Sequence, residues 1–344
     1  MKYLIAGLGS IGRRHFRNLM ALGERDIILL RTRKATLPDD ELQGYPVETD
    51  LNEALRKHEP DAVVVANPTS MHLDIAIPAA EAGCHVLLEK PVSHSLERLD
   101  ILQKAVERSG SKILVGFQFR YHPTLTQARQ LIRSHVLGEI LTAHAHWGEY
   151  LPQWHPWEDY RQGYAARADL GGGVILTLTH PLDYLRYLIG EVESLWSFNG
   201  HISPLEIDVE DVAETGLKFV SGAIGGVHVN YFQRPPVHRL EIVGTQGTLH
   251  WDNALGLLHL YRMSIPFGSY SNHSQAPAQQ TFFPPDDFER NQLFMAQTRH
   301  FMDVVRGQSE PVCTLEDGVI ALRLALAAYQ SQESGRIIRM AGAG

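Results

Sequence analysis

A Gly-x-Gly-x-x-Gly turn close to the start of the chain, formed by Gly7, Gly9 and Gly12, constrains the fold more than any other feature. A short apolar run, Tyr3–Ala6, precedes the turn, and a helical pattern, Ile11–Leu22, follows it. In such a turn the first glycine permits a tight bend, the second lets a pyrophosphate approach the backbone, and the third lets the helix pack closely on the strand. Since a helix N-terminus attracts phosphate, the turn predicts a dinucleotide site. The residues expected at the phosphates are Gly7, Gly9, Ser10, Ile11 and Gly12.

The first third of the chain alternates short apolar runs with helical patterns. We expect strands at 3–6, 27–30, 62–66, 86–89 and 112–116, and helices at 11–22, 51–57, 71–82 and 96–109. Continuous apolar strands separated by helices indicate a parallel sheet covered on both faces. The predicted fold class is therefore α/β, with an N-terminal doubly wound Rossmann sheet.

The pattern changes after a junction near residues 117–123. Helices are expected at 125–134, 174–188 and 315–331, and strands with apolar and polar residues in alternation at 214–219, 223–232, 240–243, 248–251 and 257–261. Period-two alternation is typical of an antiparallel sheet with one covered face. We expect a Rossmann domain at 1–118 and a second domain at 119–344, an open, mostly antiparallel sheet with helices on one face. The C-terminal tail is free to return to the first domain, and the polar stretch 264–285 is predicted to be a long surface loop.

Composition narrows the classes of partner and location. With 344 residues the chain can form two ordinary domains, and its formal net charge of −8 argues against general nucleic-acid binding. Two cysteines, Cys84 and Cys313, give no disulfide framework, which is typical of a reducing cytoplasm. No apolar run approaches the roughly 18 residues of a membrane span, so a membrane is not an expected partner. Because of the negative net charge, a nucleic acid is not an expected partner either.

The end of the second strand bears on the choice of cofactor. An acidic residue there would accept a hydrogen bond from the ribose 2′-hydroxyl of NAD. This sequence instead has Arg31, Thr32, Arg33 and Lys34, which suit a 2′-phosphate because arginine offers several donors to phosphate oxygens. We therefore expect NADP in preference to NAD. A solvated basic loop in an NAD enzyme that lacks the acid is the alternative.

An ordered set of motifs resembles the glucose-fructose oxidoreductase, inositol dehydrogenase and rhizopine-catabolism (Gfo/Idh/MocA) family. The motifs are Gly7–Gly12, Ala66–Thr69 with His72, Glu89-Lys90-Pro91, Gly116–Pro123 and Gly171–Asp183. The tripeptide alone is a weak signal, but the set runs in order over essentially the whole chain.

The resemblance implies an NAD(P)-dependent dehydrogenase or reductase acting on CH–OH groups of a sugar, inositol or sugar derivative, including acidic or nucleotide-linked ones. It implies that Lys90 lies beside the nicotinamide and the substrate, and that His180 is the catalytic acid or base. The cofactor contacts it implies beyond the glycine turn are Asn67, Pro68, Thr69, His72, Glu89, Lys90 and Gln118.

The residues themselves support Lys90 and His180 less strongly. Lys90 follows a buried strand at the carboxyl edge of the sheet, where α/β folds bind ligands, but its ammonium group could simply reach water. Histidine titrates near neutrality, as proton transfer requires, yet a histidine on an apolar helix is often a hydrogen-bonded core residue. Many family members have an aspartate three or four residues before this histidine, where this chain has Thr177 and Leu176. Asp183, three residues after His180, could orient it or anchor the helix to a loop.

Aromatic, polar and charged residues at the junction and after it are candidates for substrate binding. The residues are Arg120, Tyr121, Trp154, His155, Tyr160, Arg161, Thr177 and Asp183. Flat apolar faces with several donors suit a polyhydroxylated ligand, although a packed surface loop would have the same composition. Arg120, Arg161 and Arg167 could bind an anionic group on the substrate.

Several other interpretations remain open. A non-catalytic regulator that senses NAD(P) and a sugar would lack the lysine that is present here as Lys90. An NAD-dependent glycoside hydrolase and a reductase of a non-sugar ligand are not separated by sequence. His144 and His146 could begin a metal site, but no third ligand is evident, so no metal is expected.

The second sheet also predicts self-association. Apolar residues at 217, 219, 227, 229 and 231 would leave an exposed patch if a single helix layer covers the sheet. We expect a homodimer or homotetramer joined through the C-terminal sheet, as the family resemblance also implies.

Overall fold

The structure is a computed structural model that describes residues 1–31, 40–263, 267–269 and 278–340. The chain divides into two compact units. The first unit comprises residues 1–118, 162–172 and 289–323, and the second comprises 119–161, 173–288 and 324–344. The first division falls between Gln118 and Phe119. Two later segments nevertheless belong to the first unit rather than to the second.

The first unit contains a six-stranded parallel sheet in the order β3-β2-β1-β4-β5-β6. This is the doubly wound order in which ligands bind at the carboxyl ends of the strands. The strands are β1 Tyr3–Ala6, β2 Ile27–Leu30, β3 Val47–Glu48, β4 Ala62–Val65, β5 His85–Leu88 and β6 Ile113–Val115. The α-helices are α1 Ser10–Ala21, α2 Leu51–His58, α3 His72–Glu81, α4 Leu99–Ser109 and α8 Asn291–Val305. Because helices lie on both faces, strands such as β1 and β4 are buried at every residue.

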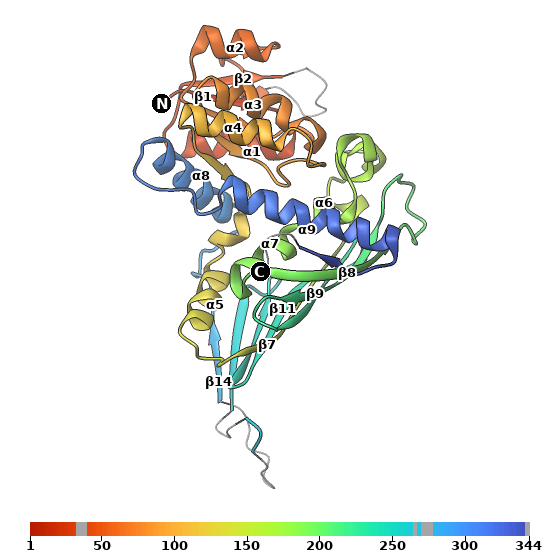
Figure 1. The fold of residues 1–344 in the computed structure, drawn as a ribbon. Helices are drawn as coiled ribbons and strands as arrows, with labels where there is room; N and C mark the ends of the chain where they lie inside the picture. Colours follow the sequence, from red (N-terminus) through yellow and green to blue (C-terminus); the bar gives the residue numbers. More distant parts are fainter. Residues whose placement is uncertain (32–39, 264–266, 270–277, 341–344) are drawn as a thin grey trace. The chain divides into compact units, whose positions relative to one another are not determined.

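The second unit contains a nine-stranded sheet in the order β14-β13-β12-β11-β7-β10-β9-β8-β15. Its neighbouring strands are antiparallel except for β7 and β10, which run parallel. The strands are β7 Ile140–Tyr150, β8 Val192–Gly200, β9 Val212–Phe219, β10 Ile224–Asn230, β11 Phe232–Gly244, β12 Gly247–Asp252, β13 Leu257–Arg262, β14 Ala278–Phe282 and β15 Ile338–Arg339. The helices α5 Pro123–Arg133, α6 Val174–Thr177 and α7 His180–Ile189 pack on this sheet (Figure 1), and α9 Leu315–Ser334 contributes its last residues to the same unit.

The helix expected at 174–188 is two helices. α6 ends at Thr177 and α7 begins at His180, with Leu178 outside helical geometry between them. Pro181 explains the break, because proline has no N–H to donate to the carbonyl group of Thr177 and its ring crowds that carbonyl. His180 therefore opens a helix instead of lying in the middle of one.

Two further expectations are corrected by the structure. The predicted loop at 264–285 contains the edge strand β14, and residues 264–266 and 270–277 of it lie outside the described part of the chain. The predicted exposed apolar patch is wrong, because its residues are buried: Leu217, Phe219, Val227, Val229 and Tyr231. Their alternation with polar neighbours turns them toward the helix-covered face.

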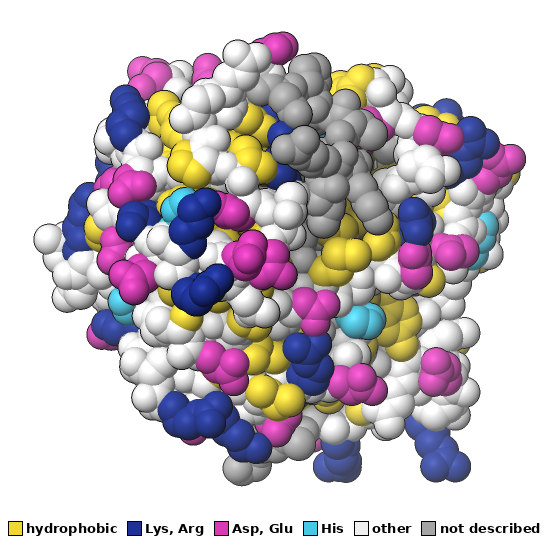
Figure 2. Space-filling view, turned by 90° about the horizontal axis from the view of Figure 1, so that it is seen from above, with side chains coloured by type: hydrophobic (Ala, Val, Ile, Leu, Met, Phe, Trp, Pro, Cys, Tyr) yellow, Lys and Arg dark blue, Asp and Glu magenta, His cyan; other side chains and the backbone are white. Residues whose placement is uncertain are grey.

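The surface carries charged side chains of both signs, as the composition of the chain leads one to expect. Figure 2 shows basic and acidic side chains interspersed over the face that it draws. Of the helices in the described ranges, none combines the length and the apolar character that spanning a bilayer requires.

Candidate functional site

The glycine turn after β1 has the backbone geometry that a dinucleotide site requires. Gly7 has φ +91°, and a Cβ atom there would lie 2.6 Å from the Asn67 backbone nitrogen. A Cβ atom on Gly12 would overlap the Gly7 carbonyl oxygen, whereas one on Gly9 would meet open space. Any side chain at Gly9 would therefore occupy the space over the start of α1. Ser10 and Ile11 open that helix, whose first N–H groups have no partner within the helix. The turn thus fits a pyrophosphate.

The residues expected at the adenosine end are only partly described. Arg31 directly follows β2 and is half-buried. Thr32 and Arg33 lie outside the described residues. Within the described residues, the end of β2 is therefore followed by one cation, Arg31.

Glu89 and Lys90 follow β5 at the carboxyl edge of the parallel sheet. The Glu89 carboxylate is buried and lies 2.7 Å from Nε2 of His15 on α1. Burial acts to raise the pKa of Glu89, but the hydrogen bond to His15 and the charges of Lys90 and His72 outweigh burial and lower it. The cofactor contact predicted for Glu89 stays a prediction, and its carboxylate contacts the buried His15.

His72 is also buried, although the sequence predicted a cofactor contact for it. Its Nδ1 lies 2.8 Å from the Pro91 carbonyl oxygen, and its Nε2 lies 3.0 Å from the Asn67 carbonyl oxygen. Burial lowers the pKa of His72, against the hydrogen bonds to these carbonyl groups and the Glu89 charge. Both ring nitrogens are therefore occupied by the backbone.

The remaining predicted cofactor residues lie in the same unit. The Asn67 side chain donates to the Met71 carbonyl oxygen, at 2.9 Å. Pro68 caps the 3₁₀ turn η2, Thr69–Met71, and Thr69 and Gln118 are buried. The loop after β4 thus reaches the glycine turn through the Asn67 backbone, as a cofactor-binding edge requires.

His180 belongs to the second unit and lies among aromatic rings. Its ring centroid is 5.0 Å from Phe119 in an edge-to-face contact and 5.5 Å from Trp147 in a stacked one. His238 stacks on the other ring neighbour, Trp147, at 4.1 Å and 6°. These rings hold the imidazole of His180 at the start of α7. Sequence analysis did not single out Phe119, Trp147 or His238, because they come from three separate segments.

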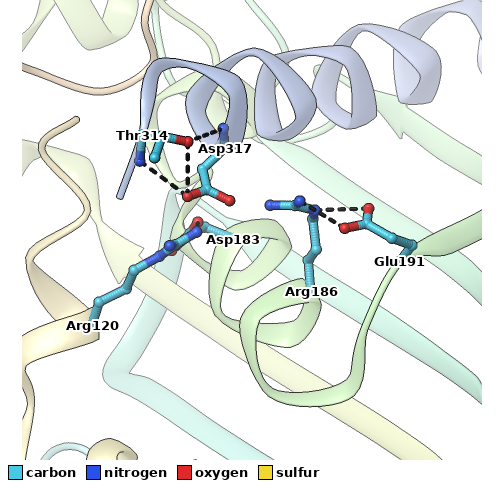
Figure 3. Close-up of polar contacts among 6 residues, drawn as sticks. All are labelled: Arg120, Asp183, Arg186, Glu191, Thr314 and Asp317. Atoms are coloured by element: carbon cyan, nitrogen blue, oxygen red, sulfur yellow. Dashed lines mark hydrogen bonds and ion pairs between the residues drawn. The ribbon is translucent and has the colours of Figure 1, made fainter. Parts of the chain in front are cut away.

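Arg120 and Asp183 form a buried ion pair (Figure 3). Nε and Nη2 of Arg120 donate to the two carboxylate oxygens of Asp183, at 3.1 and 2.6 Å. Arg120 lies in the 3₁₀ turn η3, Gln118–Tyr121, so the pair attaches α7 to this turn. The predicted role of Arg120 in binding an anionic substrate stays a prediction beside this contact. Of the two roles left open for Asp183, anchoring is the one that the contact supports.

Glu210 accepts hydrogen bonds from the first two residues of α6. Its backbone carbonyl accepts from the Val174 N–H at 3.1 Å, and its carboxylate accepts from the Ile175 N–H at 3.0 Å and the Tyr329 hydroxyl at 2.7 Å. Burial raises the pKa of Glu210. Gly173 has φ +102°, and a Cβ atom there would lie 2.5 Å from both carboxylate oxygens. The glycine is thus required beside Glu210, a residue that sequence analysis missed.

The predicted substrate loop is held by its own ion pairs. Arg161 contacts the carboxylates of Asp159 and Glu206, at 2.8 and 2.5 Å, and the Tyr160 hydroxyl accepts from the Glu206 N–H at 3.1 Å. Trp154 packs edge-to-face on Tyr231, at 5.5 Å. Arg161 therefore already has two carboxylate partners.

The remaining predicted substrate residues lie on several different elements. Arg167, in the first unit, pairs with Asp169 at 2.5 Å. His155 contacts the Trp157 ring at 5.2 Å, while Thr177 is buried at the end of α6 and Tyr121 is half-buried at the end of η3. Asp183 lies on α7 with His180, and Thr177 ends the preceding helix α6. Arg161 lies on the loop that Glu206 contacts.

His144 and His146 lie on β7, and His146 is in register with His228 of β10. Among the residues that the structure describes, no group of three or more His, Cys, Asp or Glu side chains could hold a metal ion.

Comparisons with known proteins agree with this geometry. Residues 1–117 match the oxidoreductase family with an NAD-binding Rossmann fold, and residues 125–250 match the GFO/IDH/MocA C-terminal domain. A scyllo-inositol 2-dehydrogenase (NAD(+)) of Bacillus subtilis is 28% identical, over 98% of this chain and 95% of that protein. A 2,7-anhydro-N-acetylneuraminate hydratase of Escherichia coli is 28% identical over 56% of this chain and 51% of its own.

A solved structure supports the fold. Levoglucosan dehydrogenase in complex with NADH and levoglucosan superposes with a TM-score of 0.83, at 19% identity and 99% coverage of both chains. The two matched regions follow one another along the chain, and the residues between them, 118–124, separate the strands of the first sheet from those of the second. Together with the glycine turn and the strand order, they show that the chain belongs to the Gfo/Idh/MocA family of NAD-binding oxidoreductases.

Proposed function

We propose that the protein transfers hydride between a nicotinamide cofactor and a hydroxyl-bearing carbon of a sugar, inositol or sugar derivative, with Lys90 and His180 as catalytic residues. The observation that carries the proposal is the position of Lys90, two residues after the end of β5. Carboxyl ends of parallel strands meet at one edge, so Lys90 shares its edge with the glycine turn and the Asn67 loop.

Both partners of the redox reaction have a defined task. A bound nicotinamide would supply the acceptor for the hydride that leaves the substrate carbon. The hydroxyl oxygen must lose its proton in the same reaction, and His180 accepts it. Lys90 donates a hydrogen bond to that oxygen and stabilises negative charge as it develops. In the reductive direction His180 returns the proton and the carbonyl oxygen becomes a hydroxyl group.

A substrate screen with both cofactors tests the proposal. Purified protein is mixed with NAD(+) or NADP(+) and a panel of inositols, anhydrosugars, aldoses, uronates, sialic-acid-type sugars and nucleotide sugars. We expect absorbance of the reduced nicotinamide to accumulate with at least one of them. Absence of reduction with every member, in a protein that binds NADH, would contradict a dehydrogenase.

A net redox-neutral reaction is the second candidate. The hydratase relative carries a name for the addition of water, which involves no net oxidation. If this chain removes a hydride and returns it, product forms without accumulation of the reduced cofactor. Product analysis by mass spectrometry of the same mixtures separates the two.

The cofactor preference is proposed to be NADP(H). Arg31 stands at the end of β2, where an acidic residue would favour NAD, and Thr32, Arg33 and Lys34 continue the basic run in sequence. The B. subtilis relative is named for NAD(+), so the alternative is concrete. Calorimetric titration with both cofactors decides, and tighter NAD(H) binding would reverse the preference.

Self-association through the second sheet is also proposed, on a surface different from the predicted patch. Trp196 and Phe198 on β8 are exposed, by 40% and 69%, and their rings contact at 5.2 Å. Both alternate with the buried residues of β8, so they lie on the face opposite the helices. Exposed neighbouring aromatic rings on a sheet favour burial against a second copy.

A further inference from the structure

Lys90 lies in sequence between two residues that are each held by a buried histidine. His15 on α1 contacts the side chain of Glu89, and His72 on α3 contacts the carbonyl oxygen of Pro91. We propose that His15 and His72 are positioning residues for Lys90, which fix the Glu89–Pro91 segment at both ends. The inference rests on the proposed role of Lys90.

The contact between His15 and Glu89 leaves the carboxylate little freedom. Nε2 of His15 lies 2.7 Å from Oε1 of Glu89, and both side chains are buried. On another side, the backbone of Gly116 is so close that a Cβ atom there would lie 3.0 Å from the Glu89 carboxyl carbon. A buried carboxylate without its partner would lose a charge-assisted hydrogen bond, so Glu89 keeps this position.

His15 also connects two parts of the proposed site. It lies on α1, the helix that begins at the glycine turn. The end of β5 that carries Lys90 is thereby attached to the helix whose N-terminus faces the pyrophosphate. A displacement of one relative to the other would require breaking the contact with Glu89.

His72 holds the other end of the segment. Its Nδ1 faces the Pro91 carbonyl oxygen and its Nε2 faces the Asn67 carbonyl oxygen, at 2.8 and 3.0 Å. Carbonyl oxygens only accept, so a neutral imidazole donates to one of them and an imidazolium to both. A neutral imidazole therefore ties one of the two segments to α3, either Lys90–Pro91 or the Asn67 loop, and an imidazolium ties both. The backbone of Asn67 lies next to Gly7 of the glycine turn.

The atoms that make these contacts differ, which allows a crossed set of variants. Glutamine places its amide nitrogen near the position of Nε2, and asparagine places its amide nitrogen near that of Nδ1. His15→Gln should therefore keep the contact with Glu89, and His15→Asn should lose it. His72→Asn should keep the contact with Pro91, and His72→Gln should lose it.

Trace labelling of lysines with acetic anhydride, quantified by peptide mass spectrometry, reads the position of Lys90 without any substrate. We expect labelling of Lys90, relative to the exposed Lys218 on β9, to rise by about threefold or more in His15→Asn and His72→Gln, since a local opening exposes the amine. His15→Gln and His72→Asn should label as wild type does. If the variants acted only through a general loss of stability, the same substitution, glutamine or asparagine, would give the higher Lys90 labelling at both positions. That result would overturn the inference.

The histidine at the other end of β5 provides the control. Nδ1 of His85 accepts from the Lys112 N–H at 3.1 Å. His85→Phe removes a histidine hydrogen bond from the same strand and should leave Lys90 labelling unchanged. If His15→Asn does not fold, Glu89→Ala removes the same contact from the other side, and unchanged labelling there would equally overturn the inference.

A double-mutant cycle tests the link to catalysis, with the polyol that gives turnover in the screen. We expect His15→Asn and His72→Gln each to slow hydride transfer by about 10- to 100-fold, because small misplacement of a reacting group is costly. In the Lys90→Met background neither should slow it further, since both act through Lys90. Additive losses would overturn the inference. A full rate in Lys90→Met alone would instead reject the proposed function, while the labelling result would still judge the positioning.

Discussion

The guanidinium group of Arg120 donates two hydrogen bonds to the carboxylate of Asp183, with side chains only 3% and 2% exposed (Figure 3). The pair attaches α7 to the η3 turn three residues after His180. A bidentate geometry gives direction as well as energy, so the first turn of α7 is held in one orientation. Asp183 thus acts on the position of His180 through the helix.

Removing one partner of this pair should be costly. We expect Asp183→Ala to lower the free energy of unfolding by about 3–5 kcal/mol, because it leaves the Arg120 charge buried without its carboxylate. Urea unfolding measures the change. Asp169→Ala, which breaks the exposed pair with Arg167, is the matched control and should unfold close to the wild-type midpoint. Equal effects of the two substitutions would contradict the assigned importance of burial.

Gly173 and Gly222 separate backbone strain from side-chain crowding. Both have positive φ, at +102° and +89°, but a Cβ atom on Gly222 meets nothing, while one on Gly173 meets the Glu210 carboxylate. We expect Gly222→Ala to cost about 1 kcal/mol from strain alone. Gly173→Ala should cost about 1–3 kcal/mol more, from the displaced carboxylate. Similar unfolding midpoints for the two variants would show that Glu210 moves away freely.

His122 should make the second unit less stable in acid. Burial lowers the pKa of His122 to about 4, and the unfolded chain titrates near its ordinary value of about 6.5. Between these values the unfolded state binds a proton that the folded state does not, so stability falls as the pH falls. The full difference corresponds to about 3 kcal/mol.

His122→Phe keeps the ring contacts with Phe119 and Trp251 and removes the titrating group. Urea unfolding between about pH 4 and 7 should therefore give a shallower loss of stability in the variant. Other histidines whose pKa is lowered, such as His85 and His300, contribute with the same sign. The test is the difference from wild type, and identical slopes would exclude His122 as a contributor.

The proposed catalytic residues should affect the chemical step more than cofactor binding. We expect Lys90→Met and His180→Ala to lower kcat by about 100-fold or more, as is usual for loss of a positioned acid or base. Stopped-flow hydride transfer and NADH titration measure the two quantities. Near-wild-type rates in both variants would move the search to Tyr121, His155, Tyr160 and Arg161.

Self-association should depend on the exposed rings of β8. We expect Phe198→Asp to shift the protein toward the monomer in light scattering, because a charge cannot be buried between two sheet faces without a partner. Leu255 is similarly exposed, at 67%, and lies in the turn after β12. Leu255→Asp should leave the assembly unchanged, and a wild-type monomer at micromolar concentration would refute the proposal outright.

The first unit was predictable from sequence almost strand by strand. Its strands are continuous apolar runs because both faces are buried, and the glycines of the turn after β1 indicate the phosphate site. The missed elements are the ones whose signals are weak: β3 has two residues, and α8 lies far along the chain from the sheet that it joins. The second unit was harder because alternation identifies the two faces of a strand but not which face is covered. Apolar residues such as Val227 and Val229 were therefore assigned to the wrong side.

The sequence by itself determined the parallel sheet and the glycine turn, because each depends on residue types at short, fixed spacing. Its ordered motifs also resemble the family of oxidoreductases that the two matched regions show. Only the tertiary structure decided what the polar side chains contact. Arg120 binds Asp183, Glu89 binds His15 across 74 positions, and Glu210 reaches Ile175. A buried charge must find a partner wherever the fold brings one, and sequence separation carries no information about that distance.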